Sequence, residues 1–461
     1  MSSRICTRFC FLIQDLRFIV VPKILLLAFC LLPSWLFAQG SLTPPSAPAP
    51  TFKTLQQVEP RTPISSLPYT IFSPGAYYVT TNLTGVTAAS GINIAASDVT
   101  LDLKGYSLVG VGGSIDGILV SGNRTNLWIG NGTIRGWGLE GIDGTTAQSS
   151  AFADLKIIGG GDVGLRSGTA ALVSRCVATG NSQEGLLIYD GCQVRECTAR
   201  NNGASGIATG NNCRITDCQA QFNNSDGITT GSGCSISGCT SANHTNNNTS
   251  GISTSTGCSI DHCAVANNYN GISTGADSLI SVCTALGNLN FGISLSSNSV
   301  VTASAASGNA FIGISIQGAN SAAKACVASS NATGGIELNG RYSTVEGCTA
   351  SGNLYVGIQF NAEGGLALNN TCDSNGSSFT GNAGIAGFGM TGSRIEANHF
   401  SNNSHNGLYL DAASTHNIIT RNIALTNTVQ TTSYNVSAAN NDVGPIGRAA
   451  TATSPWANLQ Y

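Results

Sequence analysis

A unit of about 21 residues recurs through most of this 461-residue chain, and its landmarks stay in step from copy to copy. One copy opens at Gly206 and the next at Gly227, with Cys218 between them. A glycine followed by Ile or Leu opens a copy at Gly91, Gly117, Gly141, Gly164, Gly185, Gly206, Gly227, Gly251, Gly271, Gly292, Gly313, Gly335, Gly357, Gly384 and Gly407, at spacings of 20 to 27 residues. A fixed short period of this kind is typical of a solenoid, in which each coil buries its apolar side only when neighbours stack on it.

Within each unit apolar and polar residues alternate, so that Ile207 and Thr209, and then Cys213 and Ile215, share one side of the chain. This period of two indicates β-strands, because a helix would place apolar residues every three to four positions. Three short strands separated by Gly, Asn and Ser turns predict a triangular coil, with coils stacked about 4.8 Å apart in parallel sheets. The expected fold is all-β, a single parallel β-helix of 14 to 15 rungs with a cap at each end. On that spacing the rod is about 70 Å long.

Two kinds of residue form columns in register with the repeat. Cysteines stand at Cys176, Cys197, Cys218, Cys239, Cys263, Cys283, Cys326 and Cys348. Asparagines fall five residues after this position of the repeat at Asn181, Asn202, Asn223, Asn268, Asn288, Asn309, Asn331 and Asn353. Stacked Asn side chains bond to the next copy and tolerate left-handed backbone. The pattern favours buried free thiols that pack as small apolar groups; disulfides and a metal site are the alternatives.

The ends of the chain differ from the repeats. Four basic residues precede an apolar run from Ile24 to Leu32, and Ala38, Gln39 and Gly40 follow. This pattern is typical of an export signal at residues 1–40, with a membrane anchor as the alternative. We expect a Pro-rich linker at 41–65, an N-terminal cap at 66–90, the β-helix at 91–442 and a C-terminal cap at 443–461.

The balance of charge excludes some partners. Without the signal the chain has 16 basic against 22 acidic residues, and charged residues are only 9% of the whole. Nucleic acids and anionic membranes need a concentrated basic face, so neither is an expected partner. No segment after the signal is long and apolar enough to cross a membrane.

The run GCQVRECTARNNGASGI and its copies resemble the right-handed parallel β-helix repeat of the pectate-lyase-like superfamily. The segments before and after the repeats are similar to those of exported bacterial β-helix proteins of mostly unassigned activity. The resemblance implies the fold and no single reaction, because this scaffold carries lyases, hydrolases, epimerases, adhesins and viral tailspikes. The polygalacturonase-like motifs Asn-Thr-Asp, Asp-Asp and Gly-His-Gly are absent.

Candidate catalytic residues lie one position before the cysteine column. Glu196, Asp217 and His262 are expected to point outward on nearby rungs, and the two carboxylates lie one rung apart. Such a pair could act in acid–base chemistry or hold calcium. Arg195 and Arg214 lie beside it and could contact an anionic sugar. The alternative is a solvated face with ordinary ion pairs.

A second group of titratable residues lies near the end of the chain: Glu396, His399, His405, Asp411, His416 and Arg421. The repeat places Glu396 and Arg421 on adjacent coils, where they are expected to pair. The histidines fall at different positions around the coil and are not expected to converge.

Aromatic and hydroxyl side chains give the remaining signs of sugar binding. Trp128 alternates with apolar neighbours and is expected to face outward, where an indole can stack on a sugar ring. Trp137 could do the same or could cover the first coils. An outward column of small hydroxyl residues, Thr229, Ser253, Ser273, Ser294 and Ser315, could lie along a polymer or be inert surface.

Two functions are consistent with these observations. The first is a secreted, periplasmic or cell-surface module that binds glycan or builds an envelope layer without catalysis; its partner would be a polysaccharide or a cell-envelope glycan. The second is a polysaccharide lyase, hydrolase or epimerase that uses Glu196 and Asp217. No cofactor is expected except calcium at that pair, and the sequence leaves the oligomeric state open.

Overall fold

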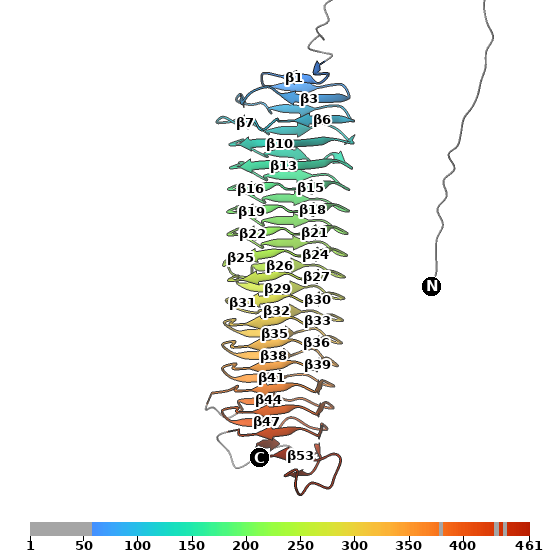
Figure 1. The fold of residues 1–461 in the computed structure, drawn as a ribbon, viewed down its shortest axis with the longest axis vertical. Coiled ribbons are helices and arrows are strands. Elements are labelled where there is room, and N and C mark those ends of the chain that lie inside the picture. Colours follow the sequence, from blue (N-terminus) through green and yellow to red (C-terminus); the bar gives the residue numbers. More distant parts are fainter. Residues whose placement is uncertain (1–57, 378–380, 428–432, 437–439) are drawn as a thin grey trace, which may run out of the picture. The chain divides into compact units, whose positions relative to one another are not determined.

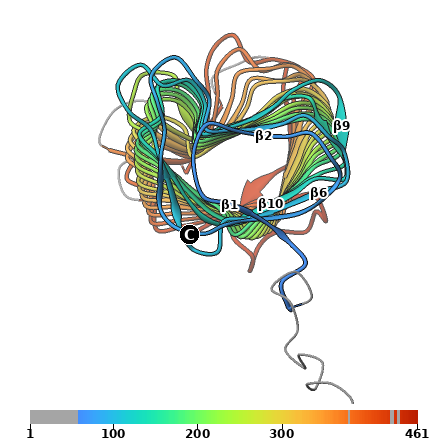
Figure 2. The same cartoon turned by 90° about the horizontal axis from the view of Figure 1, so that it is seen from above.

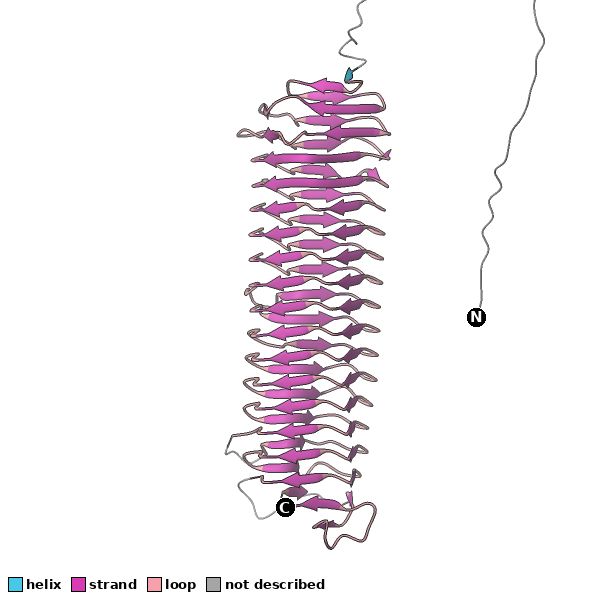
Figure 3. Ribbon diagram, in the orientation of Figure 1, coloured by secondary structure: helices cyan, strands magenta, loops and turns pink. Residues whose placement is uncertain are grey.

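The structure of the chain, a computed structural model, describes residues 58–377, 381–427, 433–436 and 440–461. The expected signal and residues 41–57 of the expected linker lie outside this range. The chain divides into the units Met1–Val58 and Glu59–Tyr461, and the described strands all belong to the second unit. Its regular elements are 53 β-strands (Figure 3). The all-β prediction is confirmed.

The strands stack in three parallel ladders, because each turn of the chain contributes one strand to each (Figure 1). The first ladder contains β2 (Tyr69–Ile71), β5 (Ile92–Ile94), β8 (Ile118–Val120), β11 (Ile142–Gly144), β14 (Leu165–Ser167), β17 (Leu186–Ile188), β20 (Ile207–Thr209), β23 (Ile228–Thr230), β26 (Ser250–Thr254), β29 (Asn270–Thr274), β32 (Ile293–Leu295), β35 (Ile312–Ile316), β38 (Gly334–Leu338), β41 (Val356–Phe360), β44 (Ala383–Gly387), β47 (Asn406–Leu410) and β50 (Tyr434–Val436).

The second ladder contains β1 (Thr62–Ile64), β3 (Gly75–Val79), β6 (Val99–Asp102), β10 (Trp128–Arg135), β13 (Ala151–Ile158), β15 (Leu172–Ser174), β18 (Gln193–Arg195), β21 (Arg214–Thr216), β24 (Ser235–Ser237), β27 (Ser259–Asp261), β30 (Leu279–Ser281), β33 (Val300–Thr302), β36 (Ala322–Lys324), β39 (Thr344–Glu346), β42 (Leu366–Leu368), β45 (Arg394–Glu396), β48 (Ile418–Thr420) and β51 (Asp442–Val443).

The third ladder contains β4 (Leu83–Thr84), β7 (Ser107–Val109), β16 (Val177–Thr179), β19 (Thr198–Arg200), β22 (Gln219–Gln221), β25 (Thr240–Ala242), β28 (Ala264–Ala266), β31 (Thr284–Leu286), β34 (Ala305–Ser307), β37 (Val327–Ser329), β40 (Thr349–Ser351), β43 (Thr371–Asp373), β46 (His399–Ser401), β49 (Ile423–Leu425) and β53 (Asn458–Gln460). The long strands β10 and β13 run through both the second and third ladders. The short strands β9 (Arg124–Thr125) and β12 (Ala147–Gln148) pair with each other, and β52 (Ile446–Gly447) pairs with β53.

The register puts like residues over like, as the repeat predicts. Ile207 pairs with Ile228 in the first ladder and Val194 with Ile215 in the second, and all four side chains are buried. Seen from above, successive turns lie over one another (Figure 2). The interior is therefore a stack of side-chain columns, and the outer faces of the ladders carry the polar residues.

The first ladder has 17 strands, two more than the anchors predicted. The additional strands, β2 and β50, open with Tyr69 and Tyr434 in place of the glycine and aliphatic pair. Tyr434 is buried, and its hydroxyl lies 2.9 Å and 3.0 Å from the main-chain oxygens of Asn422 and Leu459, so an aromatic ring closes this end of the stack. End turns lack a neighbour on one side and depart from the repeat for that reason.

The cysteine and asparagine columns are both internal. All thirteen cysteines of the described residues are free and buried, which confirms the thiol interpretation over disulfides. The main-chain N–H of Cys197 donates to Sγ of Cys218 at 3.4 Å, and the amide of Asn202 donates to Oδ1 of Asn223 at 2.9 Å. Each column thus joins one turn to the next through side chains as well as through the main chain.

The gap in the Asn column between Asn223 and Asn268 is filled by His244. Its Nδ1 accepts the main-chain N–H of Asn223 at 3.1 Å, and its own main-chain N–H donates to Oδ1 of Asn268 at 3.1 Å. The repeat is three residues longer here than the one before it and four longer than the one after it, and His244 is fully buried. The longer imidazole keeps the ladder continuous where the spacing changes.

The expected cap segments contribute strands to the ladders. In the segment 66–90, β2 pairs with β5 and β3 with β6. In the segment 443–461, β53 pairs with β49. Within the described residues we find no helix with the length and apolarity needed to traverse a bilayer.

Candidate functional site

Glu196, Asp217 and His262 lie at the corner between the second and third ladders, where one residue per turn has left-handed backbone. Their φ angles are 54°, 54° and 51°. The main-chain N–H of Glu196 donates to Thr216 and that of Asp217 to Ser237, each at 3.0 Å. The three side chains are exposed on one column, as predicted, because this corner directs them away from the core.

The corner does not bring the three groups together. The carboxylate of Asp217 lies over Gly238 of the following turn, on the side away from Glu196, and a side chain at 238 would clash with it. His262 follows Gly238 by one more turn, and its Nδ1 lies 2.6 Å from Oδ2 of Asp261. This hydrogen bond and one from Ser281 lower the pKa of Asp261. The column therefore resembles a solvated corner more than a paired acid and base.

Calcium fits this corner only in part. Among the described residues, no three or more His, Cys, Asp or Glu side chains gather so that they could hold a metal ion. Ca²⁺ takes about six to eight oxygen ligands. Glu196 and Asp217 would supply a minority, so a bound glycan and water would have to supply the rest, and calcium here remains a prediction.

Arg195 and Arg214 line one hollow on the outer face of the second ladder. Its other walls are Gln193 and Thr216, and its volume is about 240 Å³. Gln193 pairs with Arg214 and Arg195 with Thr216 in the ladder, so the arginines occupy one diagonal of a four-residue grid. We call these four residues the arginine hollow.

Neither guanidinium of the arginine hollow is neutralised. In the part of the chain that the structure describes, neither Arg195 nor Arg214 has a carboxylate within 4.0 Å. The neighbouring Arg175 differs, because it makes two bonds to Asp154 at 2.7 and 2.8 Å. Two free guanidiniums beside an amide and a hydroxyl provide a set of donors suited to an oxyanion.

Trp128 lies on the same outer column as the arginine hollow. It pairs with Ala151, which pairs with Leu172 and then Gln193, so three ladder steps of about 4.8 Å, or about 14 Å, separate it from the hollow. Its indole lies across Gly130, where a side chain would clash with the ring, and it is half-buried. Ala151 and Leu172 lie between the indole and the arginine hollow on this column.

Trp137 is not on a surface. It is 2% exposed, and its Nε1–H donates to the main-chain oxygen of Leu108 at 3.2 Å. The ring packs against Gly85 and Gly91 inside the first turns. The expected sugar-binding role of Trp137 is therefore wrong, and the alternative interpretation holds: the ring fills the wide N-terminal end of the core.

The hydroxyl column lies on the outer face of the first ladder, where Thr229, Ser253, Ser273, Ser294 and Ser315 pair in sequence. Ser315 is buried and donates to Glu337 at 3.2 Å. The other four residues of the column are half-buried, and contact with a polymer along it stays a prediction.

The sequence reasoning missed a group of charged residues on the first ladder. Asp116 and Glu140 each come directly before a glycine anchor, and both are more than 90% buried. Nη2 of Arg166 lies 3.1 Å from Oε1 of Glu140. Burial raises the pKa of Glu140 to about 7, and the neighbouring Asp116 adds to this shift. The position before each anchor was the signal that could have found them.

The second titratable group behaves as expected. Arg421 pairs with Glu396 at 2.8 Å, which confirms the adjacent-coil prediction, and Arg394 also contacts Glu396. The histidines lie apart, with His399 in β46, His405 before β47 and His416 at a left-handed corner.

The family "Right handed beta helix region" matches residues 90–241 and 313–444, more than half of the chain. The chain belongs to this family. The right-handed β-helix expected from the repeat is thereby confirmed, and the match names no reaction. No curated protein matches the sequence.

Several solved structures are similar to this right-handed β-helix protein. The periplasmic alginate epimerase AlgG has 14% identity over 68% of this chain and 76% of its own, with a TM-score of 0.40. The A-module of Azotobacter vinelandii mannuronan C-5 epimerase AlgE6 has 12% identity over 84% and 89%, with a TM-score of 0.31. Tailspike protein 3 of bacteriophage CBA120 has 12% identity over 82% and 59%, with a TM-score of 0.30. At these values the neighbours carry no argument about activity.

Proposed function

We propose that this protein is an exported or cell-surface module that binds an extracellular polysaccharide without cleaving it. The observation that carries the proposal is the shared outer column of Trp128 and the arginine hollow. An indole lying flat on a strand offers a platform for a sugar ring. Arg195 and Arg214, three and four ladder steps further along, or about 14 to 19 Å, offer donors for an acidic group on the same polymer.

The geometry favours binding over catalysis. Glu196 and Asp217 do not face each other, and the buried carboxyls of Asp116 and Glu140 are closed to a polymer. Enzymatic hydrolysis of glycans generally needs two carboxyl groups on opposite sides of one bond. The alternative, a lyase, hydrolase or epimerase with calcium at Glu196 and Asp217, has the weaker support.

Retention on immobilised acidic and neutral polysaccharides tests the proposal. We expect Arg195→Gln with Arg214→Gln to weaken binding of an acidic polymer about tenfold or more, because each lost contact is a charge-assisted hydrogen bond. Trp128→Ala should weaken binding as well. Arg200→Gln is the matched control, since Arg200 is an exposed arginine on the third ladder. Unchanged retention by the double variant would rule out the arginine hollow.

The same incubations distinguish the enzymatic alternative. We expect no release of reducing or unsaturated ends and no change in the epimer composition of the recovered polymer, which is the change that an epimerase would cause without releasing ends. If ends were released, and if release stopped in the variant carrying Glu196→Gln and Asp217→Asn, the enzyme assignment would replace ours.

A further inference from the structure

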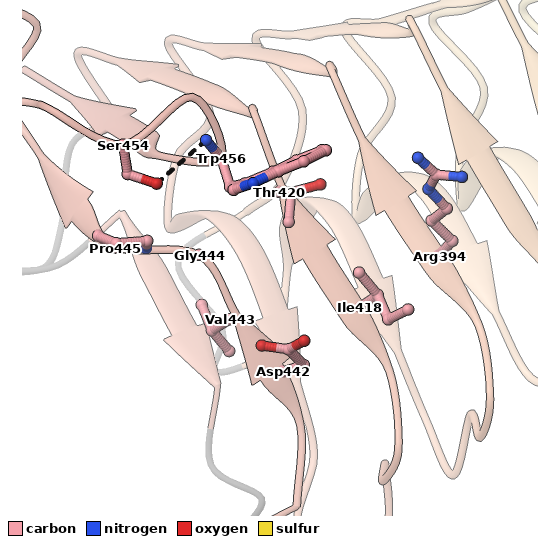
Figure 4. A pocket seen from close by; sticks show the side chains of 9 residues that line it. All are labelled: Arg394, Ile418, Thr420, Asp442, Val443, Gly444, Pro445, Ser454 and Trp456. Carbon is pink, nitrogen blue, oxygen red and sulfur yellow. Dashed lines mark hydrogen bonds between the residues drawn. The ribbon is translucent and has the colours of Figure 1, made fainter.

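A second hollow opens at the C-terminal end of the second ladder. Its volume is about 510 Å³, and we call it the terminal hollow. Arg394, Ile418 and Asp442 follow one another on β45, β48 and β51, and Trp456 and Ser454 come from the last loop beside Thr420 (Figure 4). These six residues supply an aromatic ring, an aliphatic surface, both signs of charge and two hydroxyls around one space.

Trp456 is exposed and yet held in place. Its side chain is 51% exposed, and its main-chain N–H donates to Oγ of Ser454 at 3.2 Å. On one side of the ring the guanidinium carbon of Arg421 lies 4.6 Å from the ring centre, a cation–π contact. Arg421 is fixed in turn by its ion pair with Glu396, a residue that is 7% exposed. The indole is thus oriented before any ligand arrives, which lowers the entropy lost on binding.

The charges around the terminal hollow select the kind of ligand. Asp442 is exposed and would repel a carboxylate, while it accepts hydrogen bonds from hydroxyl groups. Arg394 lies in the same outward column, two ladder steps away, and one of its N–H groups is already directed to Glu396. Ile418, which lies between them, is 45% exposed. An apolar strip flanked by one acceptor and one donor complements the face and the vicinal hydroxyls of an uncharged sugar.

We infer that the terminal hollow binds a neutral sugar ring, stacked on Trp456 and hydrogen-bonded to Asp442 and Arg394. The inference rests on the proposed function and extends it, because the two hollows lie on the same face. Eight ladder steps separate β21 from β45, about 38 Å. One polysaccharide running along the second ladder would present acidic groups to the arginine hollow and a neutral residue to the terminal hollow.

Tryptophan fluorescence can report on this site alone. In full-length protein that carries Trp35→Phe and Trp128→Phe, the remaining indoles are the buried Trp137 and the exposed Trp456. Quenching by acrylamide then depends on access to Trp456. We expect neutral cello-, malto- or manno-oligosaccharides to reduce the quenching severalfold and oligogalacturonates to leave it nearly unchanged.

Substitutions in the hollow give the second arm of the test. Asp442→Asn and Arg394→Gln should each raise the oligosaccharide concentration needed for protection about tenfold, and Glu363→Gln, at an exposed site elsewhere, should not. The inference is overturned if no neutral oligosaccharide protects Trp456, or if oligogalacturonates protect it equally well. A loss of acidic-polymer retention in the arginine-hollow variants with no protection of Trp456 would uphold the proposed function and reject this site alone.

Discussion

The main-chain N–H of Glu140 lies 3.3 Å from Oδ1 of Asp116, so two acidic side chains from successive turns share one buried space. Ser90 donates to the other oxygen of Asp116 at 3.2 Å, and Arg166 contacts Glu140 at 3.1 Å. Burial raises the pKa of both carboxyls, that of Glu140 from 4.5 to about 7. The pair therefore keeps a proton at a pH where isolated carboxyls have lost theirs.

This proton predicts a stability that falls as pH rises. Between about pH 4.5 and 7 the folded chain retains the Glu140 proton and the unfolded chain has released it, so the free energy of unfolding declines across this window. In Glu140→Gln the free energy of unfolding should fall by about 1–3 kcal/mol less over this pH range than in the unaltered protein. Urea denaturation at several pH values measures it, with the exposed Glu363→Gln as control. A decline equally steep in Glu140→Gln would contradict the assignment.

His244 should give a dependence of the opposite sign. Burial lowers its pKa below the ordinary 6.5, so the unfolded chain binds the proton first as pH falls. Its contribution is complete above about pH 6.5 and is lost in acid. We expect His244→Asn to weaken this loss and to preserve the ladder, since Asn occupies the same position in the turns on either side. His416→Asn, at an exposed left-handed corner, is the control. This change should leave the loss of unfolding free energy in acid as it is in the unaltered protein.

We expect the stability that the cysteine column provides to depend on a side chain that accepts the main-chain N–H of the preceding turn. The sulfur atom itself should matter less. Ser304 accepts the N–H of Cys283 at 3.0 Å, and Asn370 accepts that of Cys348 at 2.9 Å, at the position Cys218 occupies for Cys197. We predict that Cys218→Ser changes the free energy of unfolding by less than about 1 kcal/mol, whereas Cys218→Ala lowers it by about 1–3 kcal/mol.

The matched control for this series is Cys372→Ala. Cys372 is fully buried, but it lies in a column where its neighbour on one side is Ala350, and in the described structure its thiol makes no hydrogen bond. Equal losses for Cys218→Ala and Cys372→Ala, measured by urea denaturation, would show that packing alone matters. All thirteen thiols should react with a thiol reagent only after unfolding.

Trp137 should be the most sensitive aromatic residue. Trp137→Ala would empty the space beside Gly85 and Gly91 and should lower the free energy of unfolding by about 3–5 kcal/mol. Trp456→Ala, at an exposed ring, should cost about 1 kcal/mol or less. Thermal and urea unfolding midpoints check both, and a mild effect at Trp137 would contradict its role in the core.

Much of the architecture could be read from the repeat. Fifteen anchors predicted fifteen strands of the first ladder at their correct places, because stacking demands the same residue at the same point of each turn. The period of two placed Ile207 and Thr209 on one side of β20, and both are buried. The two end turns were missed because they open with Tyr69 and Tyr434 and lack the glycine anchor. An end turn has a neighbour on one side only, so its packing differs from that of the repeats.

The candidate sites were predicted less well. The outward direction of Glu196 and Arg195 could be inferred from strand alternation and corner position. The direction of the Asp217 carboxylate over Gly238, and the absence of a partner for Arg195 and Arg214 among the described residues, depend on side chains in other turns. Asp116 and Glu140 gave one sign, their place directly before a glycine anchor, but the repeat does not show that their carboxyls are buried together.

The sequence by itself determined the coil, its register and its internal columns, since in a solenoid each contact is made between residues one repeat apart and the period states which ones. The tertiary structure alone decided that Trp137 is enclosed and that Trp456 is exposed. Those outcomes depend on how the irregular ends and loops close over the stack. The repeat pattern cannot predict this closure, because each end of the stack occurs only once in the chain.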